Sequence, residues 1–121
     1  MPYCFNRKEA KSHGEGGTLV GAAPKGRGLI VDDVITAGTA IREAISILAA
    51  AGAQATTVVI GLDRKERAPD LDISAVMQLE SEAQIQVKSI ISLDDIREYL
   101  ATGSDSDLLA KIEAYQGQYG V

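Results

Sequence analysis

The sequence predicts an α/β fold built on a parallel sheet, and three observations support this prediction. Apolar, β-branched runs alternate along the chain with segments of helical periodicity, as a parallel sheet with crossover helices requires. The apolar run at residues 28–31 ends in two adjacent carboxylates, Asp32 and Asp33, and the run at residues 56–62 is followed by a charged segment. Open sheets of this class bind their ligands at the carboxyl ends of the strands, so we expect a site there.

Length and composition restrict the class of protein. The 121 residues, 45% of them hydrophobic and 24% charged, are expected to form a single domain. A net charge of -5 and only 4% aromatic residues disfavour a nucleic-acid partner. The apolar runs are much shorter than the roughly 20 residues that cross a bilayer, so no membrane partner is expected. The single cysteine, Cys4, cannot form an internal disulfide, which favours a cytoplasmic location.

The segment before the central strand has little periodicity. Residues 2–6 favour a short strand, and residues 7–17 carry no apolar pattern and contain three glycines, which predicts a mobile loop. A second short strand is expected at residues 18–22, with a turn at residues 24–28 that leads into the central strand.

The strongest helical pattern covers residues 39–51. Apolar residues recur there at helical spacing, at Ile41, Ala44, Ile45, Leu48 and Ala49. Gly52 is well placed to end this helix. The following strand, residues 56–62, then completes a strand-helix-strand unit.

The remaining elements are expected from caps and short apolar runs. Ser74 is a candidate N-cap for a helix over residues 75–83, and residues 86–91 predict a third strand. Ser92 with Asp95 forms a capping-box pattern for a helix that runs to about residue 101. A last helix follows Gly103, with Ser104 or Ser106 as its cap and Leu108, Leu109 and Ile112 as its apolar stripe.

The acids at the end of the central strand, Asp32 and Asp33, are the first candidate site residues. Neighbouring side chains of a strand point to opposite faces, so one carboxylate can meet a ligand while the other braces the loop or a metal. The small residues that follow offer hydroxyl groups and amide donors at the start of a helix, which suits a phosphate: Thr36, Ala37, Gly38 and Thr39. The alternative is that the acids only cap the following helix.

Carboxylates beside a phosphate require hydroxyl groups or a cation between them, and a sugar phosphate with magnesium meets this requirement. The segment resembles the phosphoribosyl-diphosphate (PRPP) binding motif of the type I phosphoribosyltransferases, in which two acids precede a T-x-G-T-like turn. The resemblance implies a PRPP site made by Asp32, Asp33, Val34, Ile35, Thr36, Ala37, Gly38, Thr39 and Ala40. It implies Mg²⁺ bound through PRPP and water, without a direct protein ligand.

A second group of candidates lies in the predicted loop: Arg7, Lys8, Lys11 and His13. Taken alone, these residues fit a solvated charged loop. Near a PRPP site, cationic side chains would neutralise the charge that develops on the diphosphate leaving group, and glycines would let the loop close and open.

This loop closely resembles the catalytic loop of the orotate phosphoribosyltransferases. The resemblance implies that Lys11 and His13, helped by Arg7 and Lys8, contact the diphosphate, and that Lys11, His13, Asp32 and Asp33 are the catalytic residues. It also implies a homodimer in which the loop at residues 7–17 reaches the partner's active site. The alternative for His13 is a plain surface histidine.

The third candidate is Arg64, just beyond the strand at residues 56–62. A guanidinium offers a planar fork for the carboxylate and imide-like oxygens of orotate. The resemblance implies that Arg64 and Thr36 contact orotate. Asp63 is expected to orient Arg64 or its loop, whereas Lys65 and Arg67 are expected to be solvated. The implied reaction is orotate plus PRPP giving orotidine 5'-monophosphate and diphosphate, in pyrimidine (UMP) biosynthesis.

The resemblance covers nearly the whole chain but only the later part of the family's domain. We therefore expect an incomplete doubly wound sheet of the type I phosphoribosyltransferase kind, without the hood over the base and the first core elements. Such a chain is expected to expose apolar edge and face, and to be inactive or nearly so alone.

Two other functions fit parts of the pattern. A PRPP-sensing regulator without catalysis would keep the motif at Asp32 but would need a nucleic-acid surface. A receiver-like phosphoacceptor domain would use Asp32, Asp33, Asp63 and Lys88, although the spacing of these residues does not match that class.

Overall fold

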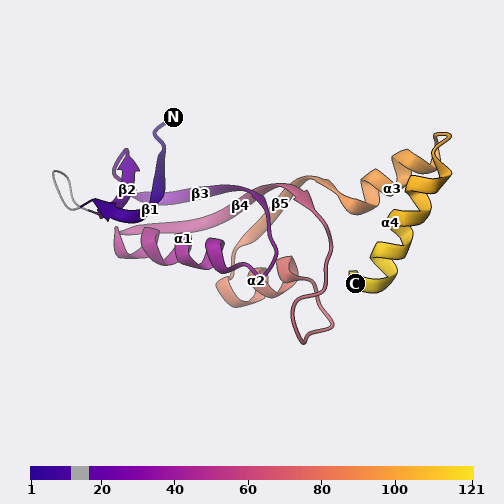
Figure 1. Cartoon of the computed structure of the whole chain (residues 1–121). Helices are drawn as coiled ribbons and strands as arrows, with labels where there is room; N and C mark the ends of the chain where they lie inside the picture. The colour runs from indigo at the N-terminus through magenta and orange to yellow at the C-terminus, as the bar shows by residue number, and fades with distance from the viewer. Residues whose placement is uncertain (12–16) are drawn as a thin grey trace.

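The computed structural model describes the backbone of residues 1–11 and 17–121, and the side chains of residues 1–7 and 19–121. Two strands pair antiparallel, β1 (Cys4–Lys11) and β2 (Gly17–Gly21). A separate parallel sheet has the order β3-β4-β5, formed by β3 (Gly26–Val34), β4 (Ala53–Asp63) and β5 (Gln86–Ser92). The helices are α1 (Thr39–Ala50), α2 (Ala75–Ala83), α3 (Leu93–Ala101) and α4 (Ser106–Tyr119) (Figure 1).

The predicted strand-helix-strand unit is confirmed as β3-α1-β4. The parallel register pairs Ile30 with Val58 and Val34 with Leu62, so the carboxyl ends of β3 and β4 reach the same edge of the sheet. Gly52, at φ 88°, follows the end of α1 in the left-handed region that glycine adopts without steric cost.

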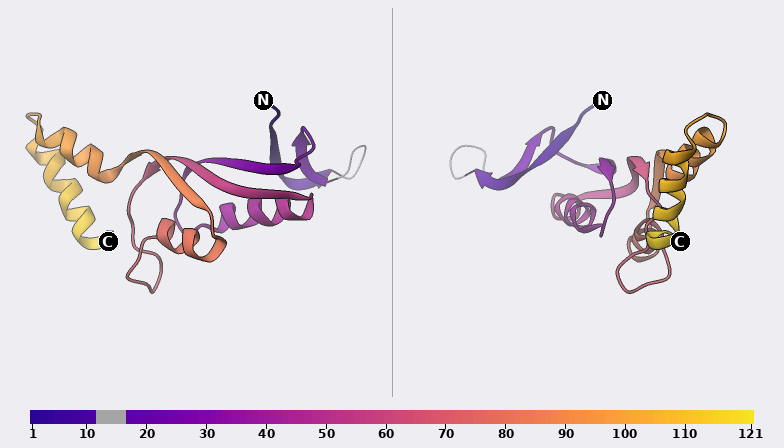
Figure 2. Two further views of the ribbon diagram at one scale, coloured as in Figure 1. Left: turned by 180° about the vertical axis from the view of Figure 1, so that it is seen from behind. Right: turned by 45° about the vertical axis from the view of Figure 1, so that its right-hand side comes forward.

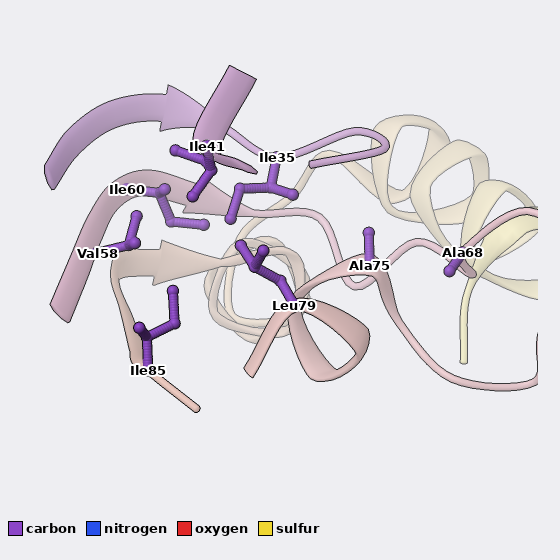
Figure 3. Close-up of a cluster of buried hydrophobic side chains, with 8 residues drawn as sticks. All are labelled: Ile35, Ile41, Val58, Ile60, Ala68, Ala75, Leu79 and Ile85. Atoms are coloured by element: carbon purple, nitrogen blue, oxygen red, sulfur yellow. The ribbon is translucent and has the colours of Figure 1, made fainter. Parts of the chain in front are cut away.

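The hydrophobic core lies between the parallel sheet and the helices α1 and α2, which lie on the same side of the sheet (Figures 1 and 2). Val58 and Ile60 of β4 meet Ile41 of α1 and Leu79 of α2. Figure 3 shows the whole cluster, which consists of Ile35, Ile41, Val58, Ile60, Ala68, Ala75, Leu79 and Ile85. Burial of these side chains fixes which face of each strand meets the helices.

The opposite face of the sheet keeps large apolar side chains in contact with solvent. Val31 of β3 is 73% exposed and Ile90 of β5 is 76% exposed, whereas Ile30 packs against the core. The cause is the two-residue period of a strand, which places neighbouring residues on opposite faces. The described residues therefore form an α/β sheet with helices on one face, and the expected exposure of apolar surface is confirmed.

The N-terminal hairpin differs from its sequence prediction. We predicted a strand over residues 2–6 and a loop over residues 7–17, but β1 continues to Lys11 and β2 begins at Gly17. Residues 12–16 lie outside the described part. A two-stranded ribbon need not bury one face, so its polar residues carry no apolar alternation by which the strand could be recognised.

The helix caps largely follow the sequence. The hydroxyl of Ser74 accepts a hydrogen bond from the Met77 amide at 3.1 Å, and Ser92 and Asp95 form the expected capping box. The helix expected after Gly103 is confirmed as α4, but its predicted cap was wrong, because Asp105 rather than Ser104 or Ser106 is the N-cap. The Asp105 carboxylate accepts from the Leu108 amide at 3.0 Å, and a carboxylate also interacts favourably with the helix dipole.

The C-terminal helices pack on each other at the end of the molecule opposite the hairpin (Figure 2). The ammonium of Lys65 lies 2.8 Å from the carboxylate of Asp94, and the amide of Arg67 donates to the carbonyl of Tyr119 at 2.7 Å. Lys65 is thus not the freely solvated charge that we expected, because it is half-buried and pairs with α3. Arg67 is exposed, as expected, and its Nη2 also donates to the carbonyl of Gly120 at 3.2 Å. The expected stripe is only half-buried at Leu109 and Ile112, and Leu108 is exposed. Among the described residues, no helix has the length and apolar character needed to cross a lipid bilayer.

Candidate functional site

A pocket of about 220 Å³ lies where β3 ends and α1 begins. It is lined by Asp32, Val34, Ile35, Thr36, Gly38, Thr39, Ala40 and Ile41. The position agrees with the sequence prediction, because it is the carboxyl end of a parallel strand. Within the predicted PRPP segment, Asp33 and Ala37 do not line the pocket, and Ile35 lines it while also packing in the core.

The two acids take different positions, as strand geometry predicts. Asp32 is half-buried and lines the pocket, whereas Asp33 is exposed on the opposite face of β3. The Asp33 amide donates to Oδ1 of Asp32 at 2.9 Å, and the Val34 amide donates to Oδ1 of Asp33 at 2.6 Å. Asp32 is therefore placed to meet a ligand, whereas Asp33 faces away from the pocket and accepts from the amide of the last residue of β3.

The beginning of α1 differs from those of the other helices. Its N-cap, Gly38, is in the left-handed conformation at φ 80°, and in the described structure no side chain caps this end. The first turn also contains no acidic residue. The amides at residues 39–41 therefore have no side-chain acceptor, and together with the helix dipole they favour a bound anion. The hydroxyl groups of Thr36 and Thr39 add further donors at the same pocket.

Arg42, which no sequence pattern singled out, joins this loop to a second helix, α2. Its Nη1 donates to the carbonyl oxygen of Ala37 at 2.5 Å, and its Nε and Nη2 donate to Glu82 of α2 at 3.1 and 2.7 Å. The sequence carries no signal for this contact, because Glu82 lies 40 residues away.

Arg64 follows the end of β4, at the sheet edge that carries the pocket, but it does not line the pocket. Its Nε lies 3.2 Å from Oε1 of Glu66, and the Tyr115 hydroxyl donates to the same oxygen. The Asp63 carboxylate accepts from the Lys65 amide at 2.8 Å, which agrees with the expectation that Asp63 shapes this loop. The side chain of Arg64 is 30% exposed, and its Nε is buried.

The predicted basic residues are only partly described. Arg7 lies half-buried in β1. The side chains of Lys8 and Lys11 and the whole of His13 lie outside the described residues, so their predicted contacts with diphosphate stay predictions.

The described part of the chain contains no group of three or more His, Cys, Asp or Glu side chains that could hold a metal ion. The pocket does offer the hard carboxylate oxygens of Asp32. One carboxylate fits a hydrated Mg²⁺ that also binds the phosphates of a substrate, and it does not make a protein cage for the ion.

The sequence and the fold of the chain were compared with those of known proteins. No protein-family model matches the chain. Curated relatives named orotate phosphoribosyltransferase include those of Saccharophagus degradans, 54% identical over 121 residues, and Pseudomonas paraeruginosa, 54% identical over 124 residues. Each alignment covers 100% of this chain, but only 56% and 57% of the two relatives.

Solved structures give the same result for the fold. The orotate phosphoribosyltransferase of Francisella tularensis superposes with a TM-score of 0.81 at 36% identity, over 100% of this chain and 57% of that one. The UMP synthase of Leishmania donovani superposes with a TM-score of 0.72 at 25% identity, over 98% of this chain and 24% of that one. The predicted fold class, a partial type I phosphoribosyltransferase sheet, is confirmed. The chain is similar along its whole length to proteins named orotate phosphoribosyltransferase, and it spans about 56% of the length of the Saccharophagus degradans relative.

Proposed function

We propose that this chain provides the PRPP-binding part of an orotate phosphoribosyltransferase. The complete reaction joins orotate to the ribose carbon of PRPP, giving orotidine 5'-monophosphate and diphosphate in pyrimidine biosynthesis. The single observation that carries the proposal is the pocket between β3 and α1, where Asp32 stands beside the helix end that lacks a side-chain cap. The names and full-chain alignments of the relatives favour the same reaction.

The pocket suits the ribose-phosphate part of PRPP. The amides at the start of α1 and the hydroxyls of Thr36 and Thr39 would donate to the 5'-phosphate. The carboxylate of Asp32 would accept hydrogen bonds from the ribose hydroxyls. These hydroxyls do not compete with the amides and threonine hydroxyls that donate to the phosphate. Mg²⁺ would enter with the diphosphate and neutralise part of its charge. These roles agree with the composition of the pocket lining.

Orotate would bind beside this pocket. We assign its carboxylate and imide-like oxygens to Arg64, because a guanidinium binds such oxygens through two parallel hydrogen bonds. Glu66, which lies 3.2 Å from the Nε of Arg64, would hold that fork in one orientation. Thr36, at the end of the phosphate loop, would contact the base from the PRPP side.

The transfer itself needs positioning and charge stabilisation rather than a covalent nucleophile. A base nitrogen attacks the anomeric carbon, while the carbon-oxygen bond to diphosphate breaks and its electron pair leaves with the diphosphate. Lys11 and His13, with Arg7 and Lys8, would stabilise the charge that develops on this leaving group. We further propose that the enzyme is a cytoplasmic homodimer whose segment 7–17 reaches the partner's site.

The direct test is titration calorimetry of the chain with PRPP, with and without Mg²⁺. We expect saturable binding that Mg²⁺ strengthens, with ribose 5-phosphate binding more weakly because it lacks the diphosphate. Failure of PRPP to bind would contradict the proposal. Formation of orotidine 5'-monophosphate is measured in parallel, and we expect the isolated chain to show little or none.

The same preparation separates the other two functions. Labelling of Asp63 by acetyl phosphate would indicate a phosphoacceptor domain instead. Binding of DNA or RNA at physiological salt, together with PRPP binding, would indicate a PRPP-sensing regulator.

A further inference from the structure

Arg42 lies next to the pocket and makes hydrogen bonds to two other segments, yet the proposed reaction gives it no role. It lies in the first turn of α1, one turn beyond Gly38. Its side chain is 37% exposed, although it makes ordered contacts with two other segments. A cation at this position is unexpected on electrostatic grounds, because the positive end of the helix dipole disfavours it.

Three hydrogen bonds hold Arg42 at this position. Nη1 reaches the carbonyl oxygen of Ala37 at 2.5 Å, and the other donors reach Glu82 at 3.1 and 2.7 Å. Glu82 is itself held, since Gln78 donates to its second oxygen at 2.8 Å. The hydrogen bond from Arg42 also lowers the pKa of Glu82 below its usual 4.5. The ion pair thus fixes the guanidinium from the side of α2.

The space around Gly38 shows how close the guanidinium of Arg42 lies to the loop that precedes α1. A Cβ built at Gly38 would lie 2.8 Å from Nη1 of Arg42, so a side chain there would require the guanidinium to move. The carbonyl of Ala37 is held on the guanidinium side, and the following segment turns into α1 in a fixed conformation.

We propose that Arg42 is a positioning residue for the phosphate loop: it holds the Ala37 carbonyl toward α2, so that the amides at the start of α1 stay directed at the ligand. This inference rests on the proposed function, because it assumes that the ligand phosphate binds at residues 36–40. In this role Arg42 acts through the loop backbone rather than on the phosphate, and three of its five guanidinium N–H donors are used within the protein. Glu82 is the anchor of the guanidinium, and its loss has a smaller effect of the same kind.

The test compares Arg42→Met with a matched control, Arg97→Met. Methionine keeps most of the aliphatic stem and removes the donors. Arg97 is a helical arginine of similar exposure, 42%, and its ion pair with Asp94 lies on α3, away from the pocket. Glu82→Gln is the third variant, because it removes the anchoring charge while leaving the bond to Ala37.

Two measurements are made on the full chain. The first is the heteronuclear ¹⁵N NOE of the amides at residues 36–40, with residues 43–50 of α1 as an internal reference. Arg42→Met should lower the loop values to those of a mobile segment while the helical values stay unchanged. The second is the dissociation constant for PRPP with Mg²⁺, which should rise about tenfold for Arg42→Met, two- to threefold for Glu82→Gln, and less than twofold for Arg97→Met.

The outcomes separate the inference from the function on which it rests. Unchanged loop NOE values in Arg42→Met would overturn the positioning role, as would an equal effect of Arg97→Met. If the unaltered chain does not bind PRPP, the proposed function is wrong, and the NOE comparison still decides whether Arg42 orders the loop. If Arg42→Met does not fold, judged by circular dichroism, the two measurements on Glu82→Gln decide the inference.

Discussion

Asp32 and Asp33 are consecutive residues of β3, yet only Asp32 lines the pocket, while Asp33 is exposed on the opposite face of the sheet. Asp32→Asn should therefore weaken PRPP binding about tenfold or more, because it removes a charged hydrogen-bond acceptor at the ligand. Asp33→Asn should weaken binding only two- to threefold, through its hydrogen bond to the Val34 amide at the end of β3. Calorimetry measures both constants. A larger loss for Asp33→Asn would show that the ligand lies on the other face of β3.

Gly38→Ala tests the left-handed start of α1. At φ 80° an alanine costs about 1–2 kcal/mol, and its Cβ must also displace the guanidinium of Arg42, 2.8 Å away. The free energy of unfolding in urea should fall by at least this amount, and PRPP binding should weaken as well. Gly117→Ala is the control, because Gly117 lies inside α4 with open space at its Cβ position. Alanine there should raise the free energy of unfolding by about 0.5–1 kcal/mol.

The ion pair of Lys65 with Asp94 makes stability depend on pH. Hydrogen bonds from Lys65 and Gln116 lower the pKa of Asp94 below its usual 3.8, and the same pairing raises the pKa of Lys65 above its usual 10.5. The contribution from Asp94 is therefore present above pH 3.8 and disappears as pH falls through the lowered value. The contribution from Lys65 is present below pH 10.5 and disappears as pH rises through the raised value.

Asp94→Asn measures this contribution. Both partners are partly exposed, at 43% for Lys65 and 32% for Asp94, so the loss should be about 1 kcal/mol or less near neutral pH. Urea denaturation of both proteins across the acid range should give curves that converge at low pH. Asp72→Asn, an exposed control in the loop before α2, should follow the unaltered chain throughout. A constant gap at every pH would mean that charge on Asp94 is not the cause.

The uncovered sheet face predicts limited solubility. Val31 is 73% exposed on β3, an edge strand of the described sheet, and unpaired apolar edges promote association. Val31→Lys should raise the protein concentration at which light scattering reports aggregates. Tyr99→Lys changes an equally exposed side chain, at 77%, on α3 instead of the sheet. An equal gain from Tyr99→Lys would attribute the effect to added charge alone.

Local patterns were enough to predict most of the fold. The α1 helix, the neighbouring strands and the capping box at Ser92 each depend on residues close in sequence, where periodicity and hydrogen bonding are encoded directly. The location of the pocket could also be predicted from a local pattern, because Asp32 and the loop that follows it are contiguous in the sequence. The continuation of β1 to Lys11 was missed, because an exposed ribbon requires no apolar alternation.

Long-range pairing explains the other omissions. The contacts of Arg42 with Glu82 and of Lys65 with Asp94 join segments that only the folded chain brings together. Charged residues on a helix surface are usually solvated, so the presence of such a residue in the sequence does not indicate that it has an ion-pair partner. Glu66 and Tyr115, 49 residues apart, were not singled out for the same reason.

The start of α1 links ligand concentration to the folding equilibrium. The helices α2, α3 and α4 each carry their own capping side chain, whereas at α1 the described structure shows none. A bound phosphate would supply the missing acceptor, so its binding and the ordering of the first helical turn become one thermodynamic process. The rate of hydrogen exchange at the amides of residues 39–41 would then fall as the ligand concentration rises. The local stability of the first turn of α1 would thus depend on the concentration of the substrate.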